Sequence, residues 1–391
     1  MKQLLLKQKY EEVMNEDEAD VVIVNTCTVK SPTQNKILRY IHDLGKKRII
    51  IAGCMVSTNK EQLTKLFKTQ LVSCDNIFDI VKIVKKELKE SIKPKHKIKI
   101  NKESISKNEV VEIIPICQGC LGNCSYCATR FARGELYSYP IKEIITHMEK
   151  ALKRGVKEFY FTAEDTGTYG LDINSSIVEL LKRAILVEGD FKIRIGMMNP
   201  IYAYKYMKEL GELLKSPKLF KFLHLPIQSG SDKILKLMNR KYTITQIKEV
   251  VNYLKNTHKD LTIITDIIVG FPNETEKDFQ DTINLMKELR FDNFNISKFW
   301  KRPNTIASKM SNQVSSDEKK DRAKKAMSSS MKISEEINKS YLGKILNVLV
   351  DEKNKSRSDN YKLVWVKSTM GKQIKVKITD YNSNSLIGKE L

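Results

Sequence analysis

Cysteine is the residue type whose spacing in this sequence points most directly to chemistry. The chain has seven cysteines, and four of them lie in one short stretch, at Cys117, Cys120, Cys124 and Cys127. The last three follow the pattern C-x3-C-x2-C, and a tight loop with that spacing can turn three thiolates toward one point, as an iron–sulfur cluster requires. Three protein ligands leave the fourth iron of such a cluster open to a substrate or cofactor. The spacing therefore predicts a cluster on Cys120, Cys124 and Cys127.

Other uses of these cysteines fit the spacing less well. The pairs Cys117–Cys120 and Cys124–Cys127 look like zinc knuckles, but zinc knuckles are normally separated by roughly a dozen residues or more, whereas these two are almost adjacent. A thioredoxin-like redox pair needs a single C-x2-C at the start of a helix. Disulfides are disfavoured because nothing in the sequence indicates export.

The longer string GCLGNCSYCATRFARGELYSYP, residues 119–140, resembles the radical S-adenosylmethionine (SAM) enzymes. Within them it is similar to the methylthiotransferases, in particular to the archaeal and eukaryotic branch that acts on N6-threonylcarbamoyladenosine in tRNA. The resemblance implies a 4Fe–4S cluster on the three cysteines, SAM on the open iron, and Tyr126 packed near the adenine of SAM. It also implies insertion of a methylthio group at C2 of the adenine that follows the anticodon.

Composition agrees with a nucleic-acid partner. A chain of 391 residues is expected to form two to three domains. Its formal net charge of +22 favours RNA or DNA over a membrane as partner, although a solvated basic surface is the alternative. No apolar run approaches the roughly 20 residues of a membrane span, and no signal-peptide pattern opens the chain. We therefore expect a cytoplasmic protein with reduced thiols.

Residues 1–90 are predicted to form a small flavodoxin-like α/β domain with a parallel sheet and without the first strand of that fold, and helices are expected over 3–14, 30–45 and 77–88. Cys27 and Cys54 each follow a predicted strand, at 20–25 and 48–53, so each is either a site residue at a strand end or a small buried residue. The resemblance implies that both bind a second, auxiliary 4Fe–4S cluster. The third family cysteine lies in an upstream turn, so we expect either an earlier start or a lost ligand. Cys74 is interpreted as a partly buried thiol.

Residues 91–110 are predicted to be a basic linker, and 111–340 a partial parallel (β/α)6 barrel followed by an exit helix. The absence of a G-x-G-x-x-G turn disfavours a dinucleotide-binding fold. The predicted strands are 112–116, 156–162, 191–197, 220–225, 261–269 and 293–298. In such barrels the chemistry lies at the carboxyl ends of the strands.

Polar residues at these strand ends are further candidates for contacts with SAM or RNA. Those expected to contact SAM are Tyr126, Glu164, Asp165, Arg194, Gln228 and Gly270. The alternative for the Glu164–Asp165 pair is a helix N-cap, and His224 is interpreted as structural rather than as a proton donor. Those expected to contact RNA are Arg133, Trp300, Arg302 and Lys344, with a core tryptophan as the alternative for Trp300.

Residues 341–391 alternate short strands with turns and are rich in lysine. They are predicted to form a small β-barrel that resembles the RNA-binding TRAM domain, with a packing or dimerisation cap as the alternative. The expected partners are a tRNA that carries threonylcarbamoyladenosine, an electron donor and a sulfur source.

Three alternative functions remain open. The first is a related methylthiotransferase that acts on isopentenyladenosine in tRNA or on a ribosomal protein, although the strings AEDTGTYG and ATRFARGELYSYP resemble neither branch. The second is a zinc-containing RNA-binding protein without catalytic activity. The third is an enzyme that cleaves SAM but inserts no sulfur.

Overall fold

The computed structural model describes residues 1–28, 31–93, 98–100 and 108–391, and the chain forms two compact units. The first unit consists of Met1–Glu103, Gln118–Tyr137 and Trp300–Lys309. The second consists of Ser104–Cys117, Ser138–Phe299 and Met310–Leu391. Residues 94–97 and 101–107 of the predicted linker lie outside the described residues.

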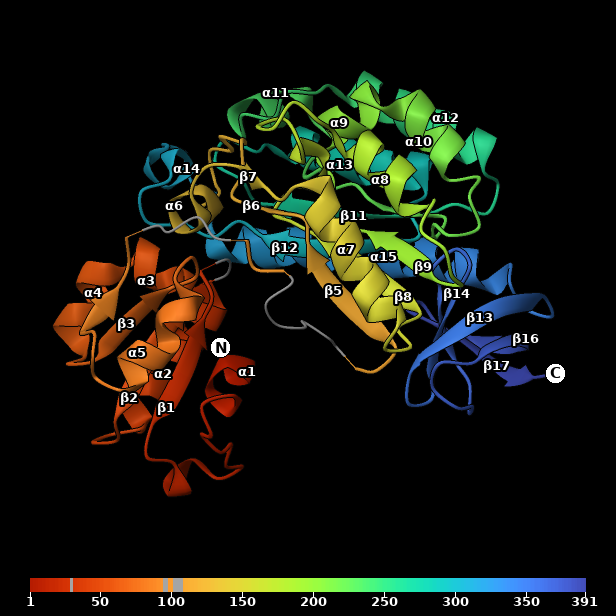
Figure 1. Ribbon diagram of the computed structural model, residues 1–391. Coiled ribbons are helices and arrows are strands. Elements are labelled where there is room, and N and C mark those ends of the chain that lie inside the picture. The colour runs from red at the N-terminus through yellow and green to blue at the C-terminus, as the bar shows by residue number, and fades with distance from the viewer. Residues whose placement is uncertain (29–30, 94–97, 101–107) are drawn as a thin grey trace. The chain divides into compact units, whose positions relative to one another are not determined.

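The first unit contains a four-stranded parallel sheet in the order β1-β2-β3-β4 (Figure 1). Its strands are β1 (Val22–Thr26), β2 (Ile49–Gly53), β3 (Gln70–Ser73) and β4 (Glu90–Ser91). Its helices are α1 (Lys2–Leu6), α2 (Ser31–Asp43), α3 (Cys54–Thr58), α4 (Lys60–Leu66), α5 (Ile80–Val84), α6 (Thr129–Arg133) and α14 (Ile306–Lys309). Because β2 is apolar throughout, it packs on both faces: Ile51 joins one core cluster and Ile50 the other.

Two predicted helices of this region are shorter than the sequence pattern indicated. The helix predicted over 3–14 ends at Leu6, and Lys9 adopts a positive φ of 62°. The helix predicted over 77–88 is a 3-10 turn (Ile77–Asp79) followed by α5, and Lys86 has the same positive φ. A left-handed residue ends a helix because it breaks the i to i−4 hydrogen-bond series. The apolar spacing of the sequence continues beyond both helix ends, so it did not reveal where the helices end.

The second unit confirms the predicted barrel of six parallel strands. Three strands form the sheet β5-β8-β9 and three form β10-β11-β12, and bridges such as Met197–His224 join β9 to β10. The strands are β5 (Val111–Pro115), β8 (Glu158–Thr162), β9 (Lys192–Ile195), β10 (Phe222–His224), β11 (Thr262–Val269) and β12 (Asn293–Lys298). The short strands β6 (Cys117–Gln118) and β7 (Tyr137–Ser138) form a separate two-stranded sheet.

Helices cover the outer face of these strands (Figure 1). They are α7 (Ile141–Leu152), α8 (Ile177–Ala184), α9 (Pro200–Lys205), α10 (Met207–Leu213), α11 (Asp232–Leu237), α12 (Ile244–Thr257), α13 (Glu276–Leu289) and the exit helix α15 (Ser316–Lys339). In α8 the buried residues Ile177, Leu180, Leu181 and Ala184 recur at helical spacing and form the face that packs inward. The short helices α9, α10 and α11 were not predicted, because their apolar runs are brief.

A buried ion pair fixes the exit helix α15 beside the end of β11. Arg322 is 1% exposed and its Nη1 lies 2.8 Å from a carboxylate oxygen of Glu274. The same carboxylate accepts a hydrogen bond from the backbone N–H of Gly270, the residue directly after β11. Removing one partner of such a pair would leave a buried charge uncompensated, so the pair holds α15 in one position.

The last segment is a closed five-stranded barrel in the order β13-β14-β15-β17-β16, as predicted apart from β14 (Figure 1). Its strands are β13 (Ile345–Glu352), β14 (Lys355–Ser358), β15 (Leu363–Trp365), β16 (Gln373–Tyr381) and β17 (Leu386–Glu390). Alternating buried residues such as Val376 and Ile378 fill its interior, and closure leaves no long unpaired edge.

Among the helices in the described part of the chain, none combines the length and the apolar character needed to cross a membrane.

The capping box at the start of α13 gives a first prediction. Asp278 accepts hydrogen bonds from Thr275 N (2.9 Å), Ser231 Oγ (2.7 Å) and Lys233 Nζ (2.6 Å). Burial raises the pKa of this carboxyl, but the hydrogen bonds from Lys233 and Thr275 outweigh burial and hold the pKa below its usual value of 3.8. Asp278→Ala should therefore lower the free energy of unfolding at pH 7 by about 1–3 kcal/mol.

The depressed pKa fixes the pH dependence of this effect. The contribution of Asp278 is complete above the unfolded-state pKa of 3.8 and is lost as the pH falls through the lower folded-state pKa. Urea unfolding at pH 7 and pH 3 should show the difference between wild type and Asp278→Ala shrinking at acid pH. Asp281→Ala, on the same helix but outside this network, should cost less than about 0.5 kcal/mol. Equal losses in the two variants would contradict the prediction.

Candidate functional site

The cysteine loop closes on itself through glycine. Gly119 has a φ of +77°, and a Cβ added there would lie 1.8 Å from the carbonyl oxygen of Glu135, so only glycine fits. Cys120 N donates to the carbonyl of Gly134 (3.3 Å), and Cys127 N donates to the carbonyl of Cys124 (3.1 Å). These contacts join the two ends of the loop and coil the segment between them.

The three predicted ligands lie on this loop, and backbone N–H groups are directed at two of their sulfur atoms. Gly122 N lies 3.2 Å from Cys120 Sγ, and Thr129 N lies 3.4 Å from Cys127 Sγ. A Cβ built on Gly122 would be 3.2 Å from Cys120 Sγ and 3.8 Å from Cys124 Sγ, so both sulfur atoms lie over the same glycine. N–H groups that point at sulfur stabilise thiolate over thiol, which is the form that binds iron.

This donor set fits a cubane cluster better than a single ion. In the described part of the chain, no group of three or more His, Cys, Asp or Glu side chains is arranged to hold one metal ion. The ligands of a 4Fe–4S cluster bind different iron atoms and therefore stand further apart than the ligands of one ion. Three half-exposed thiols on one loop, two of them with N–H donors, form a donor set suited to such a cluster.

The parallel sheet of the first unit brings three further cysteines into one row. Thr26 pairs with Gly53, and Gly53 pairs with Ser73. The next residues along these three strands are Cys27, Cys54 and Cys74. Because neighbouring strands lie about 4.8 Å apart, the register places the three cysteines side by side at the carboxyl edge of the sheet. Cys74 was interpreted from the sequence as a partly buried thiol and was not placed in this row, because β3 was not predicted.

Cys74 is a buried thiol in contact with Cys54. It is 6% exposed, and its Sγ donates to the carbonyl oxygen of Ala132 on α6 at 3.0 Å. A hydrogen bond with Cys54 and burial raise the pKa of the Cys74 thiol, while the charges of Arg133 and Lys99 act in the opposite direction. The thiol thus connects the sheet edge to the helix that follows the cysteine loop.

The residues expected to contact RNA in the first unit lie in different surroundings. Arg133 ends α6 and is half-buried, with its charge acting on Cys74. Trp300 is half-buried. Arg302 is 4% exposed and donates to Gln34 Oε1 at 3.0 Å, so its guanidinium is not at the surface where a phosphate could reach it. The basic pattern around Trp300 gave no indication of that burial.

In the second unit, Asp165 holds the carboxyl ends of two strands together. Its Oδ1 accepts from Gly167 N and from Asn199 N, both at 3.0 Å, and the residue is buried. It is thus the N-cap of a short 3-10 turn after β8, which was the alternative reading of the Glu164–Asp165 pair. Burial raises the pKa of Asp165, and the two N–H groups oppose that rise. Glu164 is half-exposed beside it.

Three polar side chains on the strands β10, β11 and β12, those of His224, Asp266 and Asn295, form a hydrogen-bonded group. The sequence revealed this group only in part. Asp266 Oδ1 contacts His224 Nε2 (2.9 Å) and accepts from Asn295 Nδ2 (2.8 Å). Burial raises the pKa of Asp266, but these hydrogen bonds and the charge of Arg240 leave it below its usual range. Arg240 also acts on Asp165, so its charge reaches the ends of both β8 and β11. Neither Arg240 nor Asn295 has a sequence spacing that distinguishes it from a surface residue.

The remaining SAM candidates in this unit differ in position. Gln228 is 7% exposed, adopts a positive φ of 68°, and its backbone pairs with β11, so it is a strained residue at a strand end. At Gly270 an added Cβ would lie 2.3 Å from Lys319 Cγ, so the close neighbour is α15. The guanidinium of Arg194 lies 5.1–5.4 Å from the ring centres of Tyr160, Phe222 and Tyr361, which places it against the C-terminal barrel.

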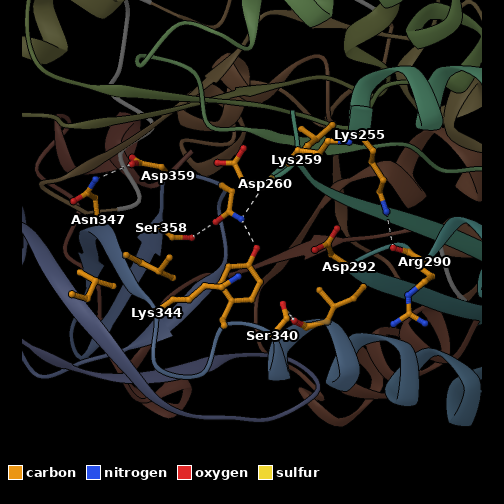
Figure 2. Close-up of a pocket in the computed structure, with 16 residues that line it drawn as sticks. Lys255, Lys259, Asp260, Arg290, Asp292, Ser340, Lys344, Asn347, Ser358 and Asp359 are labelled. Carbon is orange, nitrogen blue, oxygen red and sulfur yellow. Dashed lines mark hydrogen bonds between the residues drawn. The ribbon is translucent and has the colours of Figure 1, made fainter. Parts of the chain in front are cut away.

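Lys344 lies at a polar cleft of about 570 Å³ within the second unit. Figure 2 shows Lys344 on the side of the C-terminal barrel, with Lys255, Lys259 and Arg290 on the side of the six-stranded barrel. The acidic residues of the cleft are paired with lysines outside it: Asp260 with Lys221, Asp292 with Lys362 and Asp359 with Lys192. Among the lining cations, Arg290 pairs with Glu336 and Lys255 feels the charge of Asp292, whereas Lys259 and Lys344 are exposed.

Comparison with known families and solved structures agrees with this geometry. Residues 114–286 match the Radical SAM superfamily, and residues 1–74 match the uncharacterized protein family UPF0004. A solved radical SAM methyltransferase, TsrM from Kitasatospora setae, with cobalamin and a [4Fe-4S] cluster bound, has a TM-score of 0.56 to this chain. It is 13% identical, covering 75% of this chain and 66% of that chain, so the likeness concerns the fold alone.

Sequence relatives decide the family. A probable threonylcarbamoyladenosine tRNA methylthiotransferase of Pyrococcus horikoshii is 39% identical over 91% of this chain and 85% of that protein. One from Methanocaldococcus jannaschii is 36% identical over 100% of this chain and 92% of that protein. The chain belongs to the threonylcarbamoyladenosine tRNA methylthiotransferase family. The human member is 37% identical over 81% of this chain and 56% of its own length.

Membership of the radical SAM superfamily implies a 4Fe–4S cluster and SAM as cofactors of this methylthiotransferase. The cysteine loop, with its three thiols and two N–H donors, fits the cluster. The polar strand ends of the six-stranded barrel supply donors and acceptors suited to the amino, carboxylate and hydroxyl groups of SAM.

Loop closure at Gly119 gives the second prediction. Gly119→Ala places a Cβ on the carbonyl of Glu135, so the loop should open and the methylthiotransferase should lose the iron bound at this loop after anaerobic reconstitution. Gly155→Ala is the matched control, because Gly155 also has a positive φ (+92°) but nothing within 4 Å of the added Cβ. It should cost about 1–2 kcal/mol of stability and retain its iron. Full iron in Gly119→Ala would contradict the proposed role of the turn.

Proposed function

We propose that this protein is a tRNA N6-threonylcarbamoyladenosine methylthiotransferase. It inserts a methylthio group at C2 of the adenine that lies 3′ of the anticodon. The observation that carries the proposal is the combination of a three-thiol loop, with N–H donors on its sulfur atoms, and 36–39% identity to named family members over nearly the whole chain.

The chemistry requires a radical because the adenine C2–H bond is neither acidic nor polarised enough for acid–base catalysis. Cys120, Cys124 and Cys127 would hold a cluster that supplies one electron for the cleavage of SAM. The role of the chain is to hold SAM and to orient it for this reaction. We assign the binding of SAM to Tyr126, Glu164, Gln228 and the polar group around Asp266. The N-cap of Asp165 keeps the ends of β8 and β9 at fixed separation.

We further propose that a second 4Fe–4S cluster is bound at the carboxyl edge of the first unit's sheet, with Cys27 and Cys54 as ligands. The strand register supports this, because it sets the two cysteines side by side. The backbone around Cys54 is also favourable: Gly53 has a φ of +99°, and a Cβ there would lie 2.5 Å from the carbonyl oxygen of Thr26. The sulfur to be transferred would be held at this cluster and supplied by an external donor.

The cleft at Lys344 is proposed to contact the ribose-phosphate backbone of tRNA. Lys344 and Lys259 are exposed, while Lys255 is fixed by hydrogen bonds to the carbonyls of Leu289 and Arg290 at 2.9 and 2.8 Å. Lysines placed near phosphates release condensed counterions, which is the main sequence-independent source of affinity for RNA. A splayed base of the anticodon loop would be recognised separately, by stacking and hydrogen bonding.

Nucleoside analysis tests the activity and is the third prediction. Wild type incubated anaerobically with tRNA, SAM, a reductant and a sulfur source should convert threonylcarbamoyladenosine to its 2-methylthio form. The variant Cys120→Ala/Cys124→Ala/Cys127→Ala should form none. With two clusters, iron should fall from about eight to about four per chain in that variant.

Other outcomes separate the alternatives. Methylthiolated isopentenyladenosine would identify a different substrate branch, and SAM cleavage without a new nucleoside would indicate an enzyme that inserts no sulfur. Wild type with zinc and no iron would contradict the proposal altogether. A fall in iron from about four to none would mean that only the SAM cluster assembles.

The lysines of the cleft give the fourth prediction. Lys259→Gln/Lys344→Gln should weaken binding to unmodified tRNA and reduce the salt dependence, the slope of log K against log[salt], by about 1 per lysine. Lys182→Gln/Lys215→Gln is the control, because it removes the same charge from lysines paired with Glu179 and Glu212. An equal loss of slope in both variants would indicate that net charge, rather than the cleft, determines affinity.

A further inference from the structure

Arg302 lies in a segment that joins the sheet of the first unit to the cysteine loop. On one side Arg302 Nη1 donates to Gln34 Oε1 on α2, the helix that follows Cys27, at 3.0 Å. On the other side Ala307 N donates to the carbonyl of Ser125, inside the cysteine loop, at 2.8 Å. Thr305 Oγ1 closes the turn between them by donating to the carbonyl of Arg302 at 2.8 Å. The segment is thus fixed at both ends.

The surroundings of Arg302 are unusual for a cation. Its side chain is 4% exposed, and burial lowers the pKa of the guanidinium. The side chains of Cys27 and Cys127 act in the opposite direction and raise the pKa of the guanidinium, so both lie within electrostatic reach of it. Each belongs to a different cysteine set: Cys27 to the row at the sheet edge and Cys127 to the loop. A guanidinium remains charged even when buried, so this position carries a fixed positive charge.

We propose that Arg302 is a positioning residue whose charge stabilises the more negative, reduced state of both clusters. The inference rests on the proposed binding of one cluster by the loop and one by the sheet edge. A cluster with three thiolate ligands is anionic and gains a further negative charge on reduction. A positive charge in a low-dielectric interior near both should therefore make each easier to reduce.

The test measures potentials rather than turnover and is the fifth prediction. Two backgrounds isolate the clusters: Cys27→Ala/Cys54→Ala retains the loop cluster, and the Cys120/Cys124/Cys127 triple alanine variant retains the sheet-edge cluster. In each, EPR-monitored redox titration would compare Arg302, Arg302→Gln and Arg302→Lys. Arg302→Gln should shift the reduction equilibrium of each cluster toward the oxidised state by roughly tenfold, which is about 59 mV for one electron.

Two controls separate charge from packing. Arg302→Lys keeps the charge and should recover most of the shift. Lys301→Gln removes the same charge from the adjacent, exposed position and should change the equilibrium by less than about twofold, because solvent screens it. A lysine variant that shifts as far as the glutamine variant would overturn the proposal, since hydrogen bonding or shape would then be responsible.

Each remaining outcome is also decisive. If Arg302→Gln loses iron while Arg302→Lys retains both iron and potential, the charge is required and the proposal stands. If both lose iron, or if only one cluster shifts, the proposed bridging charge is wrong. Absence of a sheet-edge cluster in the triple variant overturns it as well. The titration uses neither tRNA nor turnover, so a different substrate would leave this result unaffected.

Discussion

Parallel strands bring their carboxyl ends to one edge of a sheet, and both candidate sites in this protein depend on that constraint. In the first unit the register of β1, β2 and β3 aligns Cys27, Cys54 and Cys74. In the second, adjacent strands bring His224, Asp266 and Asn295 together although they are far apart in the sequence. Neither arrangement requires a long loop. The regular spacing of the sheet sets the separation of the side chains.

The cations of this protein fall into two groups, those with specific contacts inside the fold and those exposed to solvent. The chain carries a net charge of +22, and some of its buried or partly buried cations make specific contacts. Arg322 holds the exit helix to Glu274, and Arg194 lies among aromatic rings of the barrel and of the C-terminal barrel. The exposed lysines at the cleft face solvent, where a polyanion would displace counterions. Burial thus distinguishes the cations that stabilise the fold from the exposed cations that can contact RNA.

The long, strongly patterned elements were predictable, and the brief or interrupted ones were not. All six strands of the barrel and α13 match their predicted ranges closely, because their apolar patterns are long and bounded by turns. The strand β3 (QLVS) contains only two apolar residues, too few for a pattern, and its omission hid the position of Cys74. The helices α1 and α5 end at Leu6 and Val84, shortly before the positive-φ residues Lys9 and Lys86, whereas the apolar spacing of the sequence continues further.

The sequence by itself determined the chemistry: three cysteines at C-x3-C-x2-C can be recognised because the ligands of the loop are neighbours in the chain. It also determined the fold class, because hydrophobic periodicity is a local property. Only the tertiary structure decided which distant residues share an environment. It buried Arg302, which the sequence pattern had assigned to RNA, and it made Asp165 the N-cap of a short turn, which was the alternative to the expected contact with SAM. Burial depends on what packs against a residue, and that is not encoded in its immediate neighbours along the chain.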